Sequence, residues 1–516
     1  MQLRLSPAAR FVLGGLSVLL GFLVVLIVQS PPTGEGERLS DAATADETTS
    51  TSTSTTTTTT STPIGATTTT TDAPINGWAD PDSSGEPWGD TVEGLLTFRG
   101  NPTRSFYGEG PVPSDPEILW RFPDQAMCSN STAGGEVRNW CGSGWTGQPA
   151  IFERDGQTWL TFGAFSRNVH FLNADTGERL LDDFPTGDII KGSVTIDPDG
   201  YPLLYTGSRD NFYRVVAFDG DGPRELWSLS ATDVSPTKWN DDWDGSSLVI
   251  DDYLFVGGEN SQFHIVKLNR GYGGDGLVTV DPELVFHTPG WDDELIAEVG
   301  GNVSIENSVA VFGNVVYFAN SGGLIQGWDI SGLKSGIDPT RVFRFWTGDD
   351  TDATLVIDDE GMIYAGVEYE RGNARSQEVG QIIKLDPSKP DDPQVWGVAQ
   401  RPRLDSGIWA TPGLYEDLLI VPTNSGDVLG LDTATGEERW RVELVGPTWS
   451  SPVIVDGIWI QGDCDGVLYA FDITDTKAEP VPLWEIELGG CIESTPALWR
   501  GQIVVGTRAG FIYALG

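Results

Sequence analysis

The chain has 516 residues, with 31 basic and 75 acidic side chains and a formal net charge of −44. This acid surplus argues against nucleic-acid binding, which needs clustered Lys and Arg to neutralise phosphates, and against adsorption to anionic membrane surfaces. The aromatic fraction of 10% is too high for a wholly disordered chain, and 64 Gly together with 19 Trp indicate a β-rich domain.

The first predicted element is an apolar run at residues 11–28, which is just long enough to cross a bilayer as a helix. Arg4 and Arg10 precede it and the next basic residue is Arg38, so residues 1–10 are expected in the cytoplasm and the rest outside. A cleaved signal peptide is the alternative, but it usually has a shorter apolar core and an A-x-A-like site. We therefore expect a single-pass membrane protein whose C-terminal domain is extracytoplasmic, at the cell surface or in a periplasm.

The segment at residues 29–90 is predicted to be a disordered, Thr/Ser-rich linker. All residues from 48 to 62 are Ser or Thr, a composition that cannot form a core. We expect this linker to tether the following domain to the membrane.

Residues 91–516 contain eight similar segments, each beginning with a short apolar strand and recurring about every 40 to 60 residues. Several continue through a DG or similar turn into further strands, which is typical of an antiparallel meander. The segments begin at Thr146, Lys191, Gly245, Glu306, Asp352, Trp409, Trp449 and Glu493. This pattern predicts an all-β, eight-bladed β-propeller with four-stranded antiparallel blades.

The last segment ends at its third strand, which is also the end of the chain. Residues 117–122 have the character of the missing fourth strand, with Trp120 at the position of the tryptophans in the other fourth strands. Pairing this strand near Tyr513 would close the ring and cover both exposed sheet edges. We expect this closure between the first and last parts of the domain.

Two motifs carry a resemblance to a known family. Residues 429–440 (LGLDTATGEERW) and the segment at 98–105 (FRGNPTRS) resemble the repeat and the lead-in of proteins with pyrroloquinoline quinone (PQQ)-like repeats, over residues 95–516. Looser copies of the repeat place Trp227 and Trp484 where the family has a tryptophan that packs between blades. The resemblance implies the propeller fold, but it covers both quinone-dependent dehydrogenases and cofactor-free scaffolds.

The starts of the eight inner strands form a column of residues around the central channel. Two positions later, seven of the eight residues carry a hydroxyl group, and strand alternation puts both columns on the same side. If that side faces the channel, its mouth combines acids, a lysine and aromatics in a predicted ligand-binding site. The predicted lining residues are Lys191, Glu306, Asp352, Trp409, Trp449 and Glu493. The alternative is a solvated funnel whose charges pair with their neighbours.

An enzymatic alternative follows from the resemblance. A PQQ- and calcium-dependent dehydrogenase for alcohols or sugars would use acid ligands for the metal, a basic residue at the quinone oxygens and a Trp on the rings. The chain lacks the adjacent cysteine pair of several such enzymes and any C-x-x-C-H haem motif. We therefore favour a binding or scaffolding module at the cell envelope, with no cofactor and no assigned catalytic residue. Its expected partner is an unidentified envelope protein or small ligand.

A second candidate site is the sequence NDDWDG at residues 240–245. It resembles the start of a calcium-binding loop, in which Asp242 and Asp244 would supply carboxylate ligands. The match is incomplete, because Asp251 stands where the loop motif has Glu. We keep Asp242 and Asp244 as predicted metal ligands.

The four cysteines fit an oxidising compartment and allow three pairings. Cys128 and Cys141 bracket a short loop, whereas Cys464 lies in a turn and Cys491 just before an inner strand. Turns between second and third strands share a face with the inner-strand starts, so we expect Cys128–Cys141 and Cys464–Cys491. The acid surplus further predicts a soluble, monomeric domain that salt stabilises.

Overall fold

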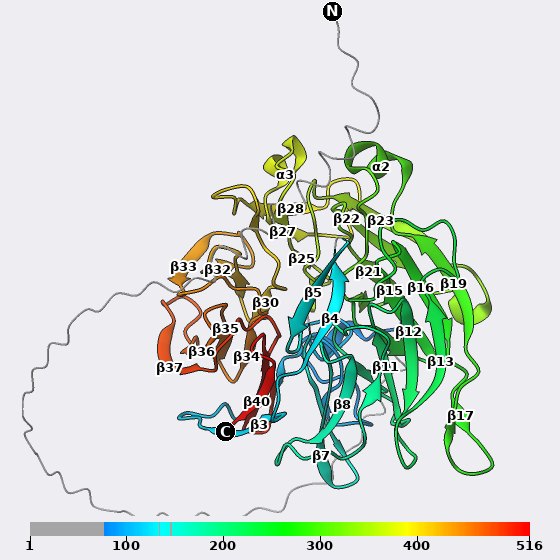
Figure 1. Cartoon of the computed structure of the whole chain (residues 1–516). Helices are drawn as coiled ribbons and strands as arrows, with labels where there is room; N and C mark the ends of the chain where they lie inside the picture. Colours follow the sequence, from blue (N-terminus) through cyan, green and yellow to red (C-terminus); the bar gives the residue numbers. More distant parts are fainter. Residues whose placement is uncertain (1–76, 134, 145–146) are drawn as a thin grey trace, which may run out of the picture. The chain divides into compact units, whose positions relative to one another are not determined.

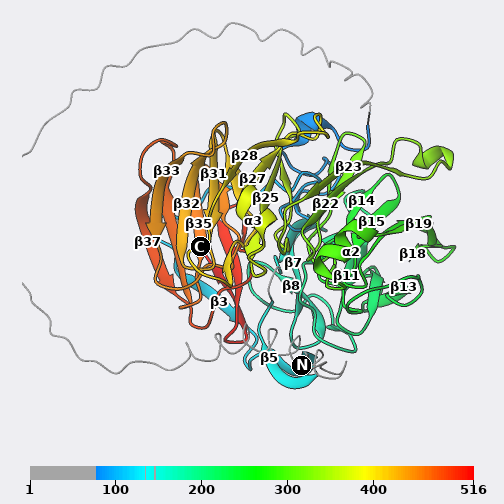
Figure 2. The same cartoon turned by 90° about the horizontal axis from the view of Figure 1, so that it is seen from above.

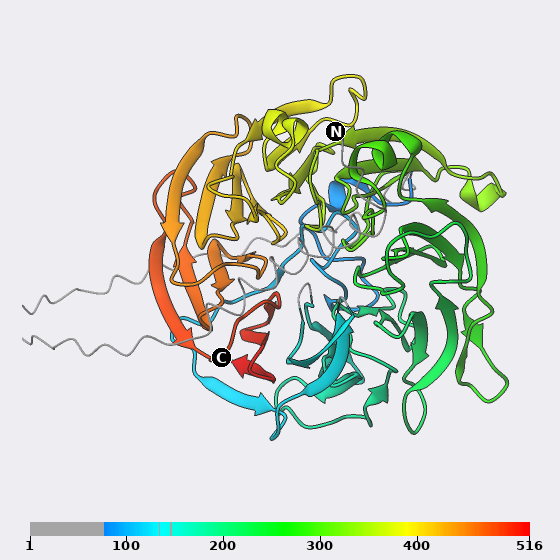
Figure 3. The same cartoon turned by 45° about the horizontal axis from the view of Figure 1, so that its top comes forward.

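The computed structural model describes residues 77–133, 135–144 and 147–516. These residues form a closed ring of eight β-sheets, as the repeats predicted (Figure 3). No helix in the described ranges is long and apolar enough to cross a membrane. The predicted membrane helix at residues 11–28 and most of the predicted linker at residues 29–90 lie outside these ranges.

Blades 1 to 4 occupy the first half of the ring. Blade 1 contains β6 (Ala150–Arg154), β7 (Gln157–Ala164), β8 (Asn168–Asn173) and β9 (Phe184–Pro185). Blade 2 contains β10 (Thr195–Ile196), β11 (Leu203–Gly207), β12 (Phe212–Ala217) and β13 (Arg224–Ser230). Blade 3 contains β14 (Leu248–Ile250), β15 (Tyr253–Gly257), β16 (Gln262–Lys267) and β19 (Glu283–Pro289). Blade 4 contains β20 (Ala310–Phe312), β21 (Val315–Phe318), β22 (Leu324–Asp329) and β23 (Thr340–Trp346).

Blades 5 to 8 complete the ring. Blade 5 contains β24 (Val356–Ile357), β25 (Ile363–Gly366), β27 (Ile382–Leu385) and β28 (Gln394–Val398). Blade 6 contains β30 (Gly413–Tyr415), β31 (Leu418–Pro422), β32 (Asp427–Asp432) and β33 (Glu438–Glu443). Blade 7 contains β34 (Val453–Val455), β35 (Ile458–Gly462), β36 (Val467–Asp472) and β37 (Val481–Glu487). Blade 8 contains β38 (Ala497–Trp499), β39 (Gln502–Thr507), β40 (Phe511–Leu515) and β3 (Ile118–Phe122).

The remaining elements decorate this ring. Strands β1 (Gly94–Leu95) and β2 (Gly108–Glu109) extend the inner edges of blades 1 and 8. Three small pairs are β4 (Cys128–Ala133) with β5 (Glu136–Cys141), β17 (Gly271–Tyr272) with β18 (Val278–Thr279), and β26 (Glu368–Tyr369) with β29 (Ser406–Gly407). The helices are α2 (Asp293–Val299), α3 (Ala374–Val379) and the short 3-10 turns η1 (Pro81–Ser83) and η2 (Leu333–Ser335).

The burial pattern of the strands distinguishes the inside of a blade from its outer edge. Strand β36 is buried along its middle four residues, whereas its outer neighbour β37 alternates between exposed and partly buried positions. A strand covered on both faces reads as a continuous apolar run, and only a half-covered strand alternates. The third strand of this blade is therefore core, and the fourth is its solvent-facing rim.

The ring closes where the sequence predicted. Strand β3 pairs antiparallel with β40, placing Trp120 opposite Ala514 and Arg121 opposite Tyr513. Figure 1 labels the two strands beside each other, and in Figure 3 the blue-to-cyan strand runs outside the red strands of the last blade. The chain's last strand thus has a partner from its N-terminal half, which removes an open edge.

Tryptophans of the outer strands fasten neighbouring blades together. The indole Nε1 of Trp120 donates to the carbonyl of Ala174 at 2.8 Å, across the junction between blades 8 and 1. Its ring lies over Gly177, where an added Cβ would approach the ring to 2.8 Å, and Gly177 also has a φ of +71°. Only glycine tolerates both conditions. The packing role predicted for the repeat tryptophans is present at this junction.

The last part of the predicted linker packs against the propeller instead. Trp78 and Trp88 are buried, and the backbone N–H of Trp78 donates to the carbonyl of Gly313 in blade 4 at 3.0 Å. The low-complexity composition that suggested a linker does not extend to residues 77–90, because two large aromatic side chains there supply apolar area to bury.

The segment that precedes blade 1 crosses the axis of the ring. Arg99 donates to the carbonyls of Pro412 and Pro452 in blades 6 and 7, both at 2.8 Å, and Arg104 donates to the carbonyl of Val309 in blade 4 at 2.7 Å. Both side chains are fully buried, which lowers the pKa of Arg99 to about 10 and that of Arg104 to about 9. Two charged guanidinium groups therefore tie opposite sides of the ring together from its centre.

One face of the ring carries most of the additions. The inter-blade loops and the turns between second and third strands meet on this side, which we call the mouth face. It bears the β4–β5 hairpin in the loop before blade 1, α2 in the loop before blade 4, and α3 in a turn of blade 5. Figure 1 shows α2 and α3 together at its top, and Figure 2 is the view from above.

Candidate functional site

The hydroxyl column predicted at the inner strands forms hydrogen bonds between blades. In four successive blades, a backbone N–H group donates to a side-chain hydroxyl of the next blade at 3.0 Å. The pairs are Ser246 to Ser308, Ser308 to Thr354, Thr354 to Thr411, and Thr411 to Ser451. Each hydroxyl thus satisfies a backbone donor where the inner strands converge. This arrangement fixes the residues two positions earlier, at the mouth of the channel.

Two groups of carboxylates line this mouth. The first, which we call the blade 3/4 trio, consists of Asp244, Glu259 and Glu306, with one oxygen from each lying within 4.8 Å of the others. Lys191 from blade 2 forms ion pairs with Asp244 and, at 3.0 Å, with Glu259. The structure therefore brings the predicted residues Lys191 and Glu306 together, and adds Glu259.

Lysine and carboxylates shift one another's ionisation in this trio. Burial raises the pKa of Asp244 and Glu306 well above the usual range, with further contributions from neighbouring carboxylates. Against the effect of burial, the Lys191 ammonium lowers the pKa of Glu259, and the surrounding acids raise the pKa of Lys191. A buried ammonium is thus retained because adjacent carboxylates compensate its lost hydration.

The predicted calcium ligands lie beside this trio. Asp242 forms an ion pair with Arg209, and burial raises the pKa of Asp242 to about 6. Asp244 is the partner of Lys191. Each of the two carboxylates therefore already has a cation from the chain, and calcium binding by them stays a prediction.

The second group, the blade 5 trio, consists of Asp350, Asp352 and Glu368. One carboxylate oxygen from each lies within 4.8 Å of the others, and all three residues are buried. The hydroxyl of Ser321 donates to Asp352 at 3.1 Å and to Glu306 at 3.3 Å, so it connects the two trios. Acidic side chains therefore form a continuous wall from blade 3 to blade 5.

Burial also dominates the ionisation of the blade 5 trio. It raises the pKa of Asp350 to about 8, although the nearby Arg371 guanidinium opposes this shift. Burial and the Asp350 carboxylate raise the pKa of Asp352 well above the usual range, and burial does the same for Glu368. Like charges at this distance cannot all ionise without a compensating cation.

The two predicted aromatic residues form one surface. Trp409 and Trp449 begin the inner strands of adjacent blades, with ring centroids 5.0 Å apart and planes inclined by 33°. Both side chains are partly exposed. They follow Asp352 in the circular order of the blades, so an aromatic wall continues the acidic one.

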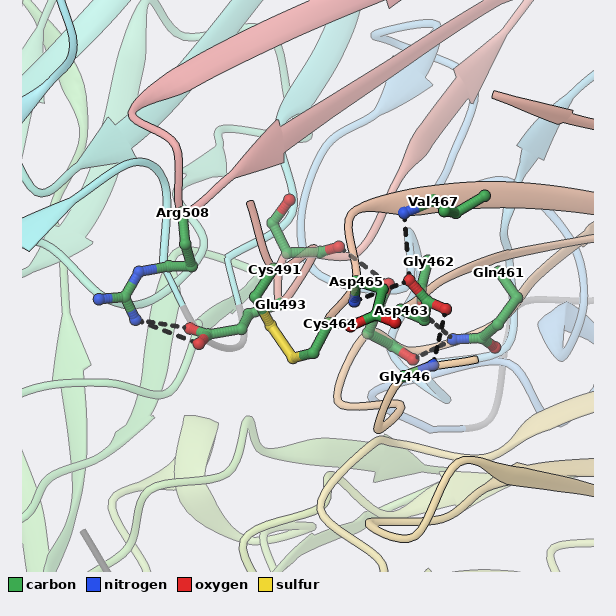
Figure 4. The surroundings of a disulfide bond; sticks show 12 residues. Gly446, Gln461, Gly462, Asp463, Cys464, Asp465, Val467, Cys491, Glu493 and Arg508 are labelled. Carbon is green, nitrogen blue, oxygen red and sulfur yellow. Dashed lines mark hydrogen bonds and ion pairs between the residues drawn. A yellow bond between two sulfur atoms is a disulfide. The ribbon is translucent and has the colours of Figure 1, made fainter. Parts of the chain in front are cut away.

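Glu493 occupies another part of the mouth. Its carboxylate pairs with Arg508 at 2.9 Å, and Figure 4 shows the two side chains pointing toward each other beside the Cys464–Cys491 disulfide. Asp463 accepts from the backbone N–H of Val467 at 3.1 Å and orders the turn that presents Cys464. Glu493 belongs to neither trio and has a cationic partner of its own.

Both predicted disulfides are present. Cys128–Cys141 joins the ends of the β4–β5 hairpin, and Cys464–Cys491 joins a turn of blade 7 to the loop before blade 8. Arg508 lies over the ring of Trp140, 5.2 Å from its centroid, and so holds the hairpin against blade 8. One disulfide therefore stabilises the hairpin, and the other links blade 7 to the loop before blade 8 on the same face.

Sequence comparisons match parts of the chain. Residues 378–515 match the family model described as outer membrane protein assembly factor BamB. The chain is 29% identical over 102 residues to that protein from Nitrosomonas eutropha, covering 20% of this chain and 23% of the relative. It is 32% identical over 128 residues to the serine/threonine-protein kinase AfsK of Streptomyces coelicolor, covering 24% of this chain and 15% of the kinase. The matches span less than a quarter of each relative.

Among solved structures, a europium-containing methanol dehydrogenase aligns with a TM-score of 0.55 and 12% identity, covering 82% of this chain and 98% of that one. The chain has the fold of a PQQ-like β-propeller. At this identity the structural match supports the fold alone.

Within this PQQ-like propeller, sequence reasoning found only part of the mouth. It identified residues that begin inner strands, but missed Asp350, which lies in the loop before blade 5. It also missed Glu259 and Glu368, which come from turns between second and third strands. The rule that placed Cys464 on the mouth face applies equally to these turns. Applied to acids, it would have placed Glu259 and Glu368 on the mouth face, but not their side chains beside the other acids.

Proposed function

We propose that this PQQ-like propeller is a binding module of the cell envelope that works without a redox cofactor and meets its partner through the mouth face. The observation that carries this proposal is the convergence of the acidic wall, the aromatic pair and three added elements on one face. The centre of the ring is meanwhile occupied by buried arginines. Loops held by a rigid scaffold commonly carry the residues that select a binding partner, and these additions lie in such loops.

The charge of the mouth is a poor match for PQQ. That cofactor carries three carboxyl groups, whereas six buried or half-buried acids line this mouth. Lys191, the one basic residue among the predicted lining residues, is already paired with Asp244 and Glu259. An anionic cofactor placed here would lie against these acids, and each of them that ionises would repel it. This supports the cofactor-free alternative over the dehydrogenase.

The similarity to an outer membrane protein assembly factor suggests the kind of partner that the mouth face binds. A relative named for assembly at a membrane suggests a protein partner in the envelope, and the predicted anchor at residues 11–28 would place the propeller there. Two disulfides suit the same oxidising location.

Site-specific photo-crosslinking in whole cells tests the proposal. A crosslinker replaces Val137, which is 69% exposed in the hairpin, or Val445, which is 77% exposed in the loop before blade 7. The matched control position is Asp456, in the first turn of blade 7 on the opposite face. We expect adducts in the envelope fraction from the two mouth-face positions and none from Asp456.

The contrary results are equally specific. Adducts from Asp456 alone would move the binding surface to the other face. Alcohol or sugar oxidation by the purified protein that depends on added PQQ and calcium would replace the binding role with the dehydrogenase alternative.

A further inference from the structure

The two carboxylate trios have similar composition but different partners. In the blade 3/4 trio, the Lys191 ammonium pairs with Asp244 and Glu259. In the blade 5 trio, no Lys or Arg of the described ranges forms an ion pair with any of the three acids. The adjacent Arg371 pairs with Asp349 instead, at 3.4 Å.

Asp350 shows that the blade 5 trio is incompletely satisfied. Its side chain is only 6% exposed, and its Oδ1 atom accepts no hydrogen bond from any residue in the described part of the chain. A buried carboxylate oxygen without a donor is costly, because it has lost its water and gained nothing in return. The Asp350 carboxyl group also shares a hydrogen bond with Asp352, which requires a proton on one of the two. The cluster therefore retains one buried carboxylate oxygen, Oδ1 of Asp350, that has no donor among the described residues.

The aromatic surface lies next to this trio. Strand β26 pairs with β29, which sets Glu368 opposite Gly407, two residues before Trp409. The backbone N–H of Thr354 also donates to the hydroxyl of Thr411 at 3.0 Å, which fixes Asp352 and Trp409 at equivalent heights on adjacent blades. If the charged end of a ligand lies at the trio, an apolar chain attached to it would therefore lie toward Trp409.

We infer that the blade 5 trio binds the ammonium group of an alkylammonium ligand, with its alkyl stem along Trp409 and Trp449. Lys191 is the internal precedent, since the same chemistry already fills the neighbouring trio. The stem of such a ligand covers apolar surface while its charged end pairs with the acids. The group belongs either to a free amine or to a lysine of the envelope partner. This inference rests on the proposed binding role of the mouth.

Binding depends on pH in a defined direction. The charged groups facing the trio are Glu306, Asp349, Glu370 and Arg371, so acids outnumber the one cation. A carboxyl group whose pKa is raised to about 8, as at Asp350, holds its proton at neutral pH and must release it to an entering cation. Affinity for the ammonium should therefore increase from pH 6 to pH 9, while a primary amine stays protonated to about pH 10.

Thermal shift and titration calorimetry on the purified full chain test the inference, with n-pentylammonium as the probe and 1-pentanol as its neutral counterpart. We expect pentylammonium to raise Tm and pentanol to leave it unchanged, because only the ammonium binds the folded state. Calorimetry in two buffers of different ionisation enthalpy should show proton release on binding. No binding of pentylammonium at pH 9 would overturn the inference.

Asp350→Asn separates lost binding from lost folding. The variant removes one charge from the trio, so the ligand-free protein should melt at a higher temperature at pH 9, while pentylammonium binds at least about tenfold more weakly. The matched control is Asp456→Asn, which removes an exposed carboxylate on the opposite face of the ring and should retain binding. Equal binding by wild type and Asp350→Asn would contradict the assignment.

Two further probes identify the source of the cation. A capped Gly-Gly-Lys-Gly-Gly peptide that binds more tightly than pentylammonium supports a lysine of a protein partner, and weaker peptide binding supports a free amine. Calcium binding that Asp350→Asn abolishes, together with no pentylammonium binding, overturns the inference in favour of a metal site. Each outcome is independent of the crosslinking result, so the ligand class and the binding face can fail separately.

Discussion

At the scale of single residues, Arg99 and Arg104 show how a charge can be buried against backbone carbonyls, since neither forms an ion pair with an acid of the described residues. Their guanidinium groups donate to backbone carbonyls from blades on both sides of the ring. A planar fork with five donors suits several carbonyls that converge on one point, which an ammonium cannot reproduce. These two residues thus connect the inner strands of several blades at the centre of the ring, in what we call the arginine hub.

Arg99→Met should destabilise the propeller strongly. The methionine keeps most of the stem but leaves the carbonyls of Thr411, Pro412 and Pro452 without their donor. Buried acceptors without partners cost about 1 to 3 kcal/mol each, so we expect a loss of about 3 kcal/mol or more. The urea unfolding midpoint, followed by circular dichroism, measures this loss.

Arg99→Lys provides the matched control for charge. It retains the positive charge but cannot form the fork, so its midpoint should lie between those of the wild type and Arg99→Met. A lysine variant as stable as the wild type would show that charge, rather than hydrogen-bond geometry, holds this hub.

At the scale of elements, β3 decides whether the ring is closed. Its pairing with β40 brings a segment near residue 120 to the last strand of the chain. Pairing between segments so far apart in the sequence carries a loop-closure entropy cost, which slows its formation. The Trp120 indole adds a hydrogen bond to Ala174 in blade 1, so this single strand connects blade 8 to its neighbour.

Trp120→Ala should weaken this closure locally. Removing the indole deletes the packing over Gly177 and the bond to Ala174, at a cost of about 3 kcal/mol, the lower end for truncation of a large aromatic. Hydrogen exchange should accelerate in β40 and β3 before it changes in blades 3 to 5. Trp120→Phe, which keeps most of the ring, should show a smaller effect. Uniform acceleration in all blades would contradict a local role.

The elements also show where sequence reasoning succeeds and where it stops. Strand starts recur with the repeat, so the eight blades, the closing strand and both disulfide pairings could be predicted. The direction of a turn side chain has no such period, so Glu259 and Glu368 were missed. The central position of Arg99 was also missed, because a segment before the first repeat has no repeat to align with. A sequence shows the position of a residue within its repeat, but it does not show which side chains from different blades meet in the folded ring.

At the scale of the whole molecule, acidic residues far outnumber basic ones. The first 75 residues contain 3 basic and 6 acidic side chains, so nearly all of the net charge of −44 belongs to the remaining chain. Many of its arginines are already in ion pairs, such as Arg270 with Asp197 and Arg439 with Asp417. The surplus acids therefore repel one another with few cations left to compensate them.

This surplus predicts that salt stabilises the propeller. Raising NaCl from about 20 mM to 500 mM shortens the screening length from about 20 Å to below 5 Å, which weakens repulsion between distant carboxylates more than contacts within ion pairs. We expect Tm at pH 8 to rise steadily over this range. Tetramethylammonium chloride is the control for general screening, because its bulky cation is a poor fit for a buried carboxylate trio. A similar rise with both salts places the effect in the overall charge, whereas a flat or falling Tm would show that the acids are already compensated in the fold.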